Sequence, residues 1–313
     1  MNITILDNAT LANTSLDCIS ALGKLTVHQL TSPEQVLAHS QNAEVLITNK
    51  VVINRDTMAQ LTSLKLICVS ATGTNNVDLV AAKQHGIAVT NVAGYSTASV
   101  VQHTFALLFN LLGNTHQYIA DCHNNQWQHA SHFCFLDHSI DEVAGLKMAL
   151  IGYGDLGRAV AKAATAFGIE TLISERKNSP VRDGRVAFDD AIANADIISV
   201  HCPLNQETEN LISTREFKLM KSSAVLINTA RGGIVDESAL AHALQTKQIK
   251  AAAIDVLSKE PAQDDNPLIQ YQGSNLLLTP HIAWASKQSI SRLIKQIALN
   301  ISAFENGEIR NRV

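Results

Sequence analysis

Three charged or titratable side chains stand just beyond apolar runs in the second half of the chain. They are Arg231, Glu260 and His281. If each run is a strand of one parallel sheet, the residues after the strands gather at one sheet edge, where such folds bind ligands. In that case the three side chains can meet in one cleft, although they lie far apart in sequence. The preceding runs are Ala224–Ile227, Ala251–Ile254 and Leu276–Leu278.

Together, these side chains match the needs of a 2-keto acid that accepts a hydride. Arg231 has a permanent charge and a planar donor fork, which suit a substrate carboxylate and a carbonyl oxygen that gains charge. His281 suits proton delivery, because histidine changes charge near neutral pH. Glu260, bonded to the imidazole, would orient it and favour its protonated form. Taken singly, each residue also fits a structural role: a surface turn, a loop end and a core histidine, respectively.

A glycine motif between an apolar run and an alanine-rich helical pattern could position the hydride donor. The first glycine permits a tight turn, the second lets a pyrophosphate approach the backbone, and the third lets the helix pack on the strand. The N–H groups near Asp155 and Leu156 would face the phosphates at the positive end of the helix dipole. A glycine turn in an ordinary strand–helix unit is the structural alternative. The motif is Gly152-Tyr153-Gly154-Asp155-Leu156-Gly157.

Glu175 ends the next apolar run, Glu170–Ser174. An acidic residue at the tip of the second strand accepts hydrogen bonds from the adenosine ribose, and its charge repels a 2′-phosphate. This predicts NAD(H) as the cofactor. Arg176 and Lys177 follow directly and would pair with a 2′-phosphate if they turned inward, so NADP(H) stays open as a second cofactor.

Length and composition describe a globular protein of two domains. The chain has 313 residues, 46% of them hydrophobic, and a formal net charge of −4, which offers no basic excess for nucleic acid or an anionic membrane. No apolar run approaches the ~20 residues that cross a bilayer, and the N-terminus lacks a signal pattern. Five scattered cysteines indicate free thiols in a reducing cytoplasm. His129, His132 and His138 lie near Cys134 without zinc-type spacing, so we expect a surface loop and no metal site.

Short apolar runs alternate with helical patterns, which predicts parallel sheets covered by helices. A long helical pattern from about Ser96 to Tyr118 is expected to bridge the domains, and Asn124–Gly145 to form a long connection. The last helix, about Ser286–Glu305, is expected to pack on the first domain. The strands expected in the first hundred residues are Ile3–Leu6, Leu25–Leu30, Val45–Thr48, Leu66–Val69 and Ala88–Val89.

A loop of small residues, Ala71–Asp78, follows one of these strands. Free backbone N–H groups in such a loop suit a small anion such as a carboxylate. A simple helix-capping loop, in which Asn and Asp form their usual turns, is the structural alternative.

Several longer motifs resemble, in order, those of the D-isomer-specific 2-hydroxyacid dehydrogenase family along nearly the whole chain. Within the family, the chain looks most like the glycerate dehydrogenases, also called hydroxypyruvate reductases, in the loop 71–78 and in Ile282-Ala283-Trp284. The matching motifs are the glycine motif, His201-Cys202-Pro203-Leu204, Asn228-Thr229-Ala230-Arg231-Gly232-Gly233, Asp255-Val256 with Glu260-Pro261, and Thr279-Pro280-His281-Ile282-Ala283-Trp284.

The resemblance implies an α/β fold of two doubly wound parallel-sheet domains. A flavodoxin-like substrate domain would comprise residues 1–99 and 286–313, and a Rossmann cofactor domain, residues 100–285, would be inserted in it. Members of the family are usually dimers joined through the cofactor domains, so we expect a cytoplasmic homodimer.

The resemblance also implies a role for each motif residue. Arg231 would anchor the substrate, Glu260 would partner the histidine, and His281 would donate the proton, while Asp255 would contact the nicotinamide amide. Gln102 precedes His103 where the family usually has Glu. The implied substrate contacts are Lys50 (with Asn49 beside it), Thr72, Gly73, Arg231 and His281. The implied cofactor contacts are Thr104, Gly152, Gly154, Asp155, Leu156, Gly157, Glu175, His201, Cys202, Pro203, Thr208, Thr229, Ala230, Arg231, Asp255 and His281.

The expected activity is therefore NADH-dependent reduction of a small 2-keto acid, hydroxypyruvate or glyoxylate, to D-glycerate or glycolate. A D-lactate-type or other dehydrogenase of the same family remains open, as does a corepressor-like protein that senses nucleotides. A formate dehydrogenase is disfavoured, because those enzymes pair their histidine with Gln and this chain has Glu260.

Overall fold

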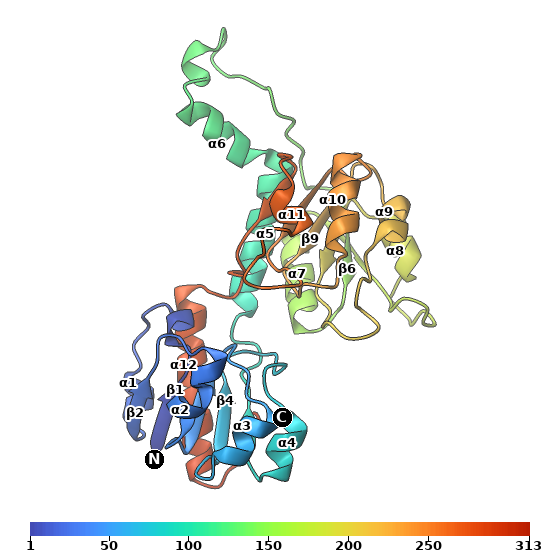
Figure 1. Cartoon of the computed structure of the whole chain (residues 1–313). Helices are drawn as coiled ribbons and strands as arrows, with labels where there is room; N and C mark the ends of the chain where they lie inside the picture. The colour runs from blue at the N-terminus through green and yellow to red at the C-terminus, as the bar shows by residue number, and fades with distance from the viewer. The chain divides into compact units, whose positions relative to one another are not determined.

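The computed structural model describes all 313 residues, which form two compact units. The first unit comprises Met1–Ser96 and Ala285–Val313, and the second comprises Thr97–Trp284. Each unit has its own all-parallel sheet and its own buried core (Figure 1). The predicted fold class, two parallel-sheet α/β domains, is confirmed.

The sheet of the first unit has the order β2-β1-β3-β4-β5. This is the flavodoxin-like order, whose direction reverses between β1 and β3. Strands β3 and β4 are buried along their whole length, as expected of a parallel sheet covered on both faces. The predicted strand Leu25–Leu30 is shorter in the structure: β2 ends at Val27, and the carbonyls of His28 and Gln29 accept hydrogen bonds from the turn that follows β1. The strands are β1 Asn2–Ile5, β2 Lys24–Val27, β3 Val45–Thr48, β4 Leu66–Val69 and β5 Ala88–Thr90.

Helix α12, Lys287–Glu305, completes the first unit and packs against α1 and β4. Its N-terminus is capped by Ser286, whose side chain accepts a hydrogen bond from the Ser289 N–H. It buries one apolar face, including Leu293 and Ile297. The other helices are α1 Asp17–Ser20, α2 Val36–Ser40, α3 Arg55–Gln60 and α4 Leu79–Gln84, with short 3₁₀ turns at Asn8–Leu11 and Pro33–Gln35.

The sheet of the second unit has the order β11-β10-β9-β8-β6-β7. Beyond β7, a single bridge between Ser174 and Val186 stands where a dinucleotide-binding fold carries a further strand. The direction of the order reverses between β6 and β8, and such a switch point opens a crevice at the carboxyl ends of the strands. The strands are β6 Lys147–Ile151, β7 Glu170–Ile173, β8 Ile197–Val200, β9 Val225–Asn228, β10 Ala251–Ile254 and β11 Leu276–Leu278.

Helices cover both faces of this second sheet. One buried cluster lies under α5 and α7 and includes Leu108 and Val160. The other lies under α8 to α11 and includes Phe217 and Leu240. The helices are α5 Thr97–Gly113, α6 Thr115–His123, α7 Asp155–Ala166, α8 Phe188–Asn194, α9 Thr214–Leu219, α10 Glu237–Gln245 and α11 Pro267–Gln270.

The long helix predicted from Ser96 to Tyr118 is two helices. Asn114 adopts a left-handed backbone with φ 48° and separates α5 from α6. Residues 114–140, here called the arm, extend away from the sheet of the second unit (Figure 1). Within the arm, the Tyr118 hydroxyl donates to the His138 carbonyl at 2.5 Å. None of the helices in the chain combines the length and apolar character needed to cross a membrane.

Candidate active site

Two of the three residues expected to share one cleft, His281 and Glu260, are bonded to each other. His281 Nδ1 lies 2.7 Å from Glu260 Oε2. The other carboxylate oxygen, Oε1, accepts a hydrogen bond from the Leu257 N–H at 3.0 Å, which fixes the side chain of Glu260. Because Nδ1 is bonded to Glu260, Nε2 is the nitrogen of His281 through which a proton can pass to a substrate.

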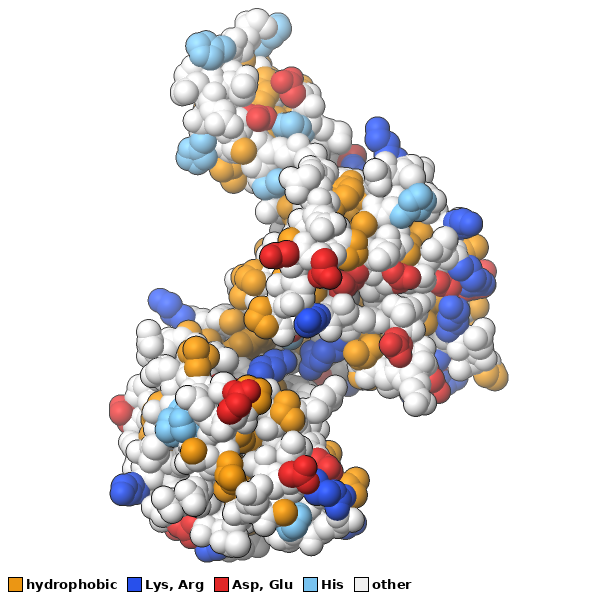
Figure 2. Space-filling model, viewed as in Figure 1, with side chains coloured by type: hydrophobic (Ala, Val, Ile, Leu, Met, Phe, Trp, Pro, Cys, Tyr) orange, Lys and Arg blue, Asp and Glu red, His pale blue; other side chains and the backbone are white.

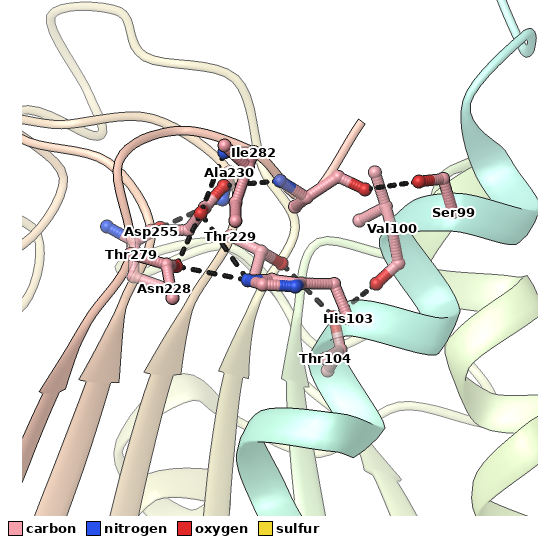
Figure 3. A network of polar contacts seen from close by, with 11 residues as sticks. Ser99, Val100, His103, Thr104, Asn228, Thr229, Ala230, Asp255, Thr279 and Ile282 are labelled. Carbon is pink, nitrogen blue, oxygen red and sulfur yellow. Dashed lines mark hydrogen bonds and ion pairs between the residues drawn. The ribbon is translucent and has the colours of Figure 1, made fainter. Parts of the chain in front are cut away.

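The loop that carries His281 is bound to Asp255 (Figure 3). The Asp255 carboxylate accepts from the N–H groups of Ile282 and Ala283 at 3.0 and 2.9 Å. The backbone carbonyl of Asp255 accepts from the His281 N–H at 2.8 Å. His281 has φ 53°, a left-handed conformation that is rare outside glycine. The bonds to Asp255 therefore hold the histidine in a conformation that it would seldom adopt alone.

Asp255 is buried, with 1% of its surface exposed. Burial opposes ionisation, but hydrogen bonds from His103, Thr279 and the two N–H groups outweigh it and hold the pKa of Asp255 below its ordinary value. The carboxylate is thus charged and bound to its own chain. In this structure, Asp255 organises the 279–283 loop, and the nicotinamide contact expected of it would add to bonds already made.

Arg231 stands at the end of β9 on a backbone fixed by its neighbour Asn228. The Asn228 side chain donates to the Arg231 carbonyl at 2.9 Å and accepts from the Ala230 N–H at 3.0 Å. Arg231 Nη1 donates to the Ala230 carbonyl at 2.7 Å. The next residue, Gly232, has no room for a side chain, since a Cβ there would lie 1.9 Å from the Leu257 carbonyl oxygen. The loop after Arg231 therefore packs directly on the backbone that leads to Glu260.

The glycine motif joins β6 to α7 at the switch point of the second sheet. Gly152 has φ 99°, and a Cβ there would lie 2.6 Å from the Cys202 nitrogen, so no other residue fits. A Cβ on Gly157 would lie 2.2 Å from the Gly152 carbonyl oxygen. A Cβ on Gly154 would meet nothing within 4 Å. Two glycines thus allow close packing within the protein, whereas Gly154 leaves open space at the start of a helix, which fits a bound pyrophosphate.

A groove of about 730 Å³ runs from this motif along the carboxyl ends of β7 and β8. Burial lowers the pKa of His201 to about 4 and raises the pKa of Cys202 to about 11, so both are neutral at pH 7. His201 Nε2 lies 2.8 Å from Ser199 Oγ, while its buried Nδ1 has no protein partner. A groove of this size with an unsatisfied ring nitrogen fits part of a dinucleotide. Of the implied contacts, it includes Gly152, Gly154, Glu175, His201, Cys202, Pro203 and Thr208.

Glu175 lines this groove, but its carboxylate is hydrogen-bonded to Arg182. Arg182 donates from Nε and Nη2 to the two carboxylate oxygens, each at 2.6 Å, and the Arg176 N–H donates at 2.8 Å. Arg185 lies 3.7 Å away. The Arg182 hydrogen bond is the main cause that lowers the pKa of Glu175 to about 2. Arg182 thus pairs with the charge that was expected to repel a 2′-phosphate, and the role of Glu175 in cofactor preference stays a prediction.

The side chains of Arg176 and Lys177 differ in their partners. Lys177 Nζ bonds to Glu216 at 2.8 Å. Arg176 is exposed, lines the groove and has no ion pair through its guanidinium. One cation therefore remains available at this end of the groove.

Thr104, Asp155 and Leu156 are implied cofactor contacts that do not line this groove. Thr104 is fully buried, and its hydroxyl bonds to Thr229 at 3.2 Å and to the Val100 carbonyl at 2.9 Å (Figure 3). Its hydroxyl thus faces Thr229 and no open surface. Asp155 and Leu156 begin α7. Across the whole chain, no group of three or more His, Cys, Asp or Glu side chains could hold a metal ion.

Lys50, Thr72 and Gly73 belong to the first unit. The backbone N–H groups of Asn49 and Lys50 donate to the buried carboxylate of Asp7, at the switch point between β1 and β3. Thr72 donates to the Val92 carbonyl at 3.0 Å. Asp7 was missed from sequence, although it directly follows a buried strand, which is the position where such side chains act.

Comparison with known proteins identifies the family. Residues 105–283 match the family model described as D-isomer specific 2-hydroxyacid dehydrogenase, NAD binding domain. The chain is 40% identical to a glycerate dehydrogenase of Methylorubrum extorquens, covering 90% of this chain and 89% of that one. It is 34% identical to a hydroxypyruvate reductase of Blautia hydrogenotrophica, covering 100% and 99%.

Solved structures agree with this assignment. A structure of an acyclic imino acid reductase in complex with NADPH and D-Arg matches with a TM-score of 0.87 and 28% identity, covering the whole of both chains. The resemblance seen in the motifs is thereby confirmed: the chain belongs to the D-isomer specific 2-hydroxyacid dehydrogenase family and is an NAD-dependent oxidoreductase.

Proposed function

We propose that this enzyme reduces a small 2-keto acid, hydroxypyruvate or glyoxylate, to D-glycerate or glycolate. The bond of 2.7 Å between His281 and Glu260 carries the proposal, because an acid-paired imidazole at a strand end is the arrangement that proton donation needs. The relatives named glycerate dehydrogenase and hydroxypyruvate reductase support the substrate.

The mechanism assigns one task to each side chain. The nicotinamide, when bound, supplies the hydride. Arg231 holds the substrate and stabilises the negative charge that grows on the carbonyl oxygen. His281 gives that oxygen a proton from Nε2. Before this transfer, Glu260 stabilises the imidazolium through its hydrogen bond to Nδ1.

The two units divide the work in this proposal. A cofactor domain with the proposed boundaries 100–285 binds the cofactor, and residues 1–99 with 286–313 form the substrate domain. Lys50, Thr72 and Gly73 help to hold the substrate carboxylate. The Asp7 contacts, which fix the backbone at Asn49 and Lys50, support the role of Lys50. Replacement of Lys50 by Ala should raise KM for the keto acid and leave the Kd for NADH unchanged.

The enzyme is also proposed to be a homodimer joined through the second unit. The arm exposes apolar side chains, among them Trp127, Phe133 and Leu136, and Phe133 is 91% exposed. In Figure 2 the arm shows hydrophobic patches between histidines. Light scattering of the double variant Phe133→Ser with Leu136→Ser should report a monomer, and a dimer of unchanged mass would contradict this interface.

We further propose a cytoplasmic enzyme without a nucleic-acid partner, which the five free cysteines and the net charge of −4 support. The first assay of function is NADH oxidation with hydroxypyruvate, glyoxylate, pyruvate and phenylpyruvate in parallel. Fast turnover of either of the first two supports the proposal. A preference for pyruvate would support a D-lactate enzyme, and NADH binding without turnover of any acid would support a corepressor-like role.

A further inference from the structure

His103 lies in the second turn of α5 and contacts the loop that carries His281. Its Nε2 is 3.0 Å from Thr279 Oγ1 and 3.4 Å from Asp255 Oδ1 (Figure 3). Thr279 stands two residues before His281, and its hydroxyl donates to Asp255 Oδ1 at 2.5 Å. The same carboxylate binds the N–H groups of Ile282 and Ala283 that follow the histidine.

The direction of each bond follows from the number of protons available. The Thr279 hydroxyl has one proton, which it gives to Asp255, so it can only accept from His103. His103 therefore carries a proton on Nε2. The hydrogen bonds run from His103 through Thr279 to Asp255, with every donor pointing the same way. Each bond in such a chain polarises and strengthens the next.

A second bond ties the same helix to the other end of the loop. Ser99 Oγ, one turn before His103, donates to the Ala283 carbonyl at 2.7 Å. Helix α5 thus contacts residues before and after His281. Strands β10 and β11 end at Ile254 and Leu278, before this loop. Helix α5 is therefore the regular element that supports the loop through hydrogen bonds.

We propose that His103 is a positioning residue for His281: through Thr279 and Asp255 it fixes the loop from which the proposed proton donor acts. This inference rests on the proposed function of His281. Displacement of a reacting group by about 1 Å can cost about 100-fold in rate. Removal of the His103 imidazole should therefore slow proton delivery without removing any group that touches substrate or cofactor.

The test compares His103→Ala with two matched variants. His103→Ala should lower kcat by about 10- to 100-fold, with little change in KM for the keto acid or in the Kd for NADH measured by fluorescence. His103→Gln should recover most of the rate, because its amide N–H can donate to Thr279. His242→Ala, an exposed histidine on α10, should match the unmodified enzyme.

Two further readouts separate positioning from simple loss of folded protein. The solvent deuterium isotope effect on kcat should rise in His103→Ala, because a misplaced donor makes proton transfer slower relative to other steps. In a double-mutant cycle with Thr279→Val, the combined loss should not exceed the larger single loss, since both variants cut one chain of bonds.

The inference is overturned if His103→Ala turns over at the normal rate, if His103→Gln is as slow as His103→Ala, or if the isotope effect stays unchanged while kcat falls. His281→Ala distinguishes this outcome from a failure of the proposed function. If His281→Ala is inactive and His103→Ala is normal, only the role of His103 fails. If His281→Ala is active, the proposed function itself fails.

Discussion

Two glutamates predicted from sequence to act in the site have opposite surroundings. Glu260 bonds to His281, the partner that the motifs suggested. Glu175 bonds to Arg182, a partner from a stretch that no motif covered. Both carboxylates are hydrogen-bonded to a cationic or basic side chain. The imidazole of His281 can release a proton, whereas the guanidinium of Arg182 keeps its protons. The position of a carboxylate in the sequence thus predicts less about its role than the side chain to which it is bonded.

The largest effect on kcat is expected when the Glu260–His281 pair loses its imidazole, which is the proposed proton donor. His281→Ala should lower kcat by about 10²- to 10⁴-fold, the usual worth of general acid catalysis. The Kd for NADH should stay nearly unchanged. Stopped-flow measurement of NADH oxidation checks the rate, and near-normal turnover would remove His281 from the role.

A smaller effect is expected when the carboxylate of that pair loses its charge. Glu260→Gln keeps the shape of the side chain but no longer stabilises the imidazolium by charge, so kcat should fall, although by less than in His281→Ala. A kcat that matches the unmodified enzyme would contradict the pairing.

The second pair is expected to set cofactor preference and not the rate. With Glu175 neutralised by Arg182, NADPH should be used beside NADH. Arg182→Ala frees the carboxylate, so the ratio of kcat/KM for NADH to that for NADPH should rise by about 10-fold, a typical worth of one charge-assisted bond. Glu175→Gln should lower the ratio. An unchanged ratio in both variants would show that the pair does not face the ribose.

The smallest effect is expected from pH acting on this second pair. Since Arg182 holds the pKa of Glu175 at about 2, below its ordinary value, the pair is fully formed above the ordinary value and is lost only as pH falls towards 2. The ratio of NADH to NADPH efficiency should therefore stay constant between about pH 5 and 9. A ratio that changes within this interval would mean that another group controls preference.

The parts that were predictable from sequence have local causes. Strands such as Val45–Thr48 and Ile197–Val200 lie where the apolar runs stand, because fully buried parallel strands read as continuous apolar stretches. The pairing of His281 with Glu260 follows the same logic, since strand ends meet at one edge of the sheet.

The parts that were missed depend on contacts distant in sequence. The break at Asn114 is a left-handed residue between two helical segments. His103 reads as one more residue of a helix, and only its distance from Thr279 shows its place in the network. Arg182 and Arg185 read as a solvated polar stretch, although the bridge at Val186 returns them to Glu175.

That bridge has a use in protein engineering. Two backbone bonds fix Val186 beside β7, from Glu175 N–H to the Val186 carbonyl at 2.8 Å and from Val186 N–H to the Ile173 carbonyl at 2.9 Å. The ten residues between Glu175 and Val186 form a surface loop whose two ends are hydrogen-bonded to each other and to the end of β7. They can be exchanged as a cassette of altered length and charge, and the register of the strands around the glycine motif will not change with them.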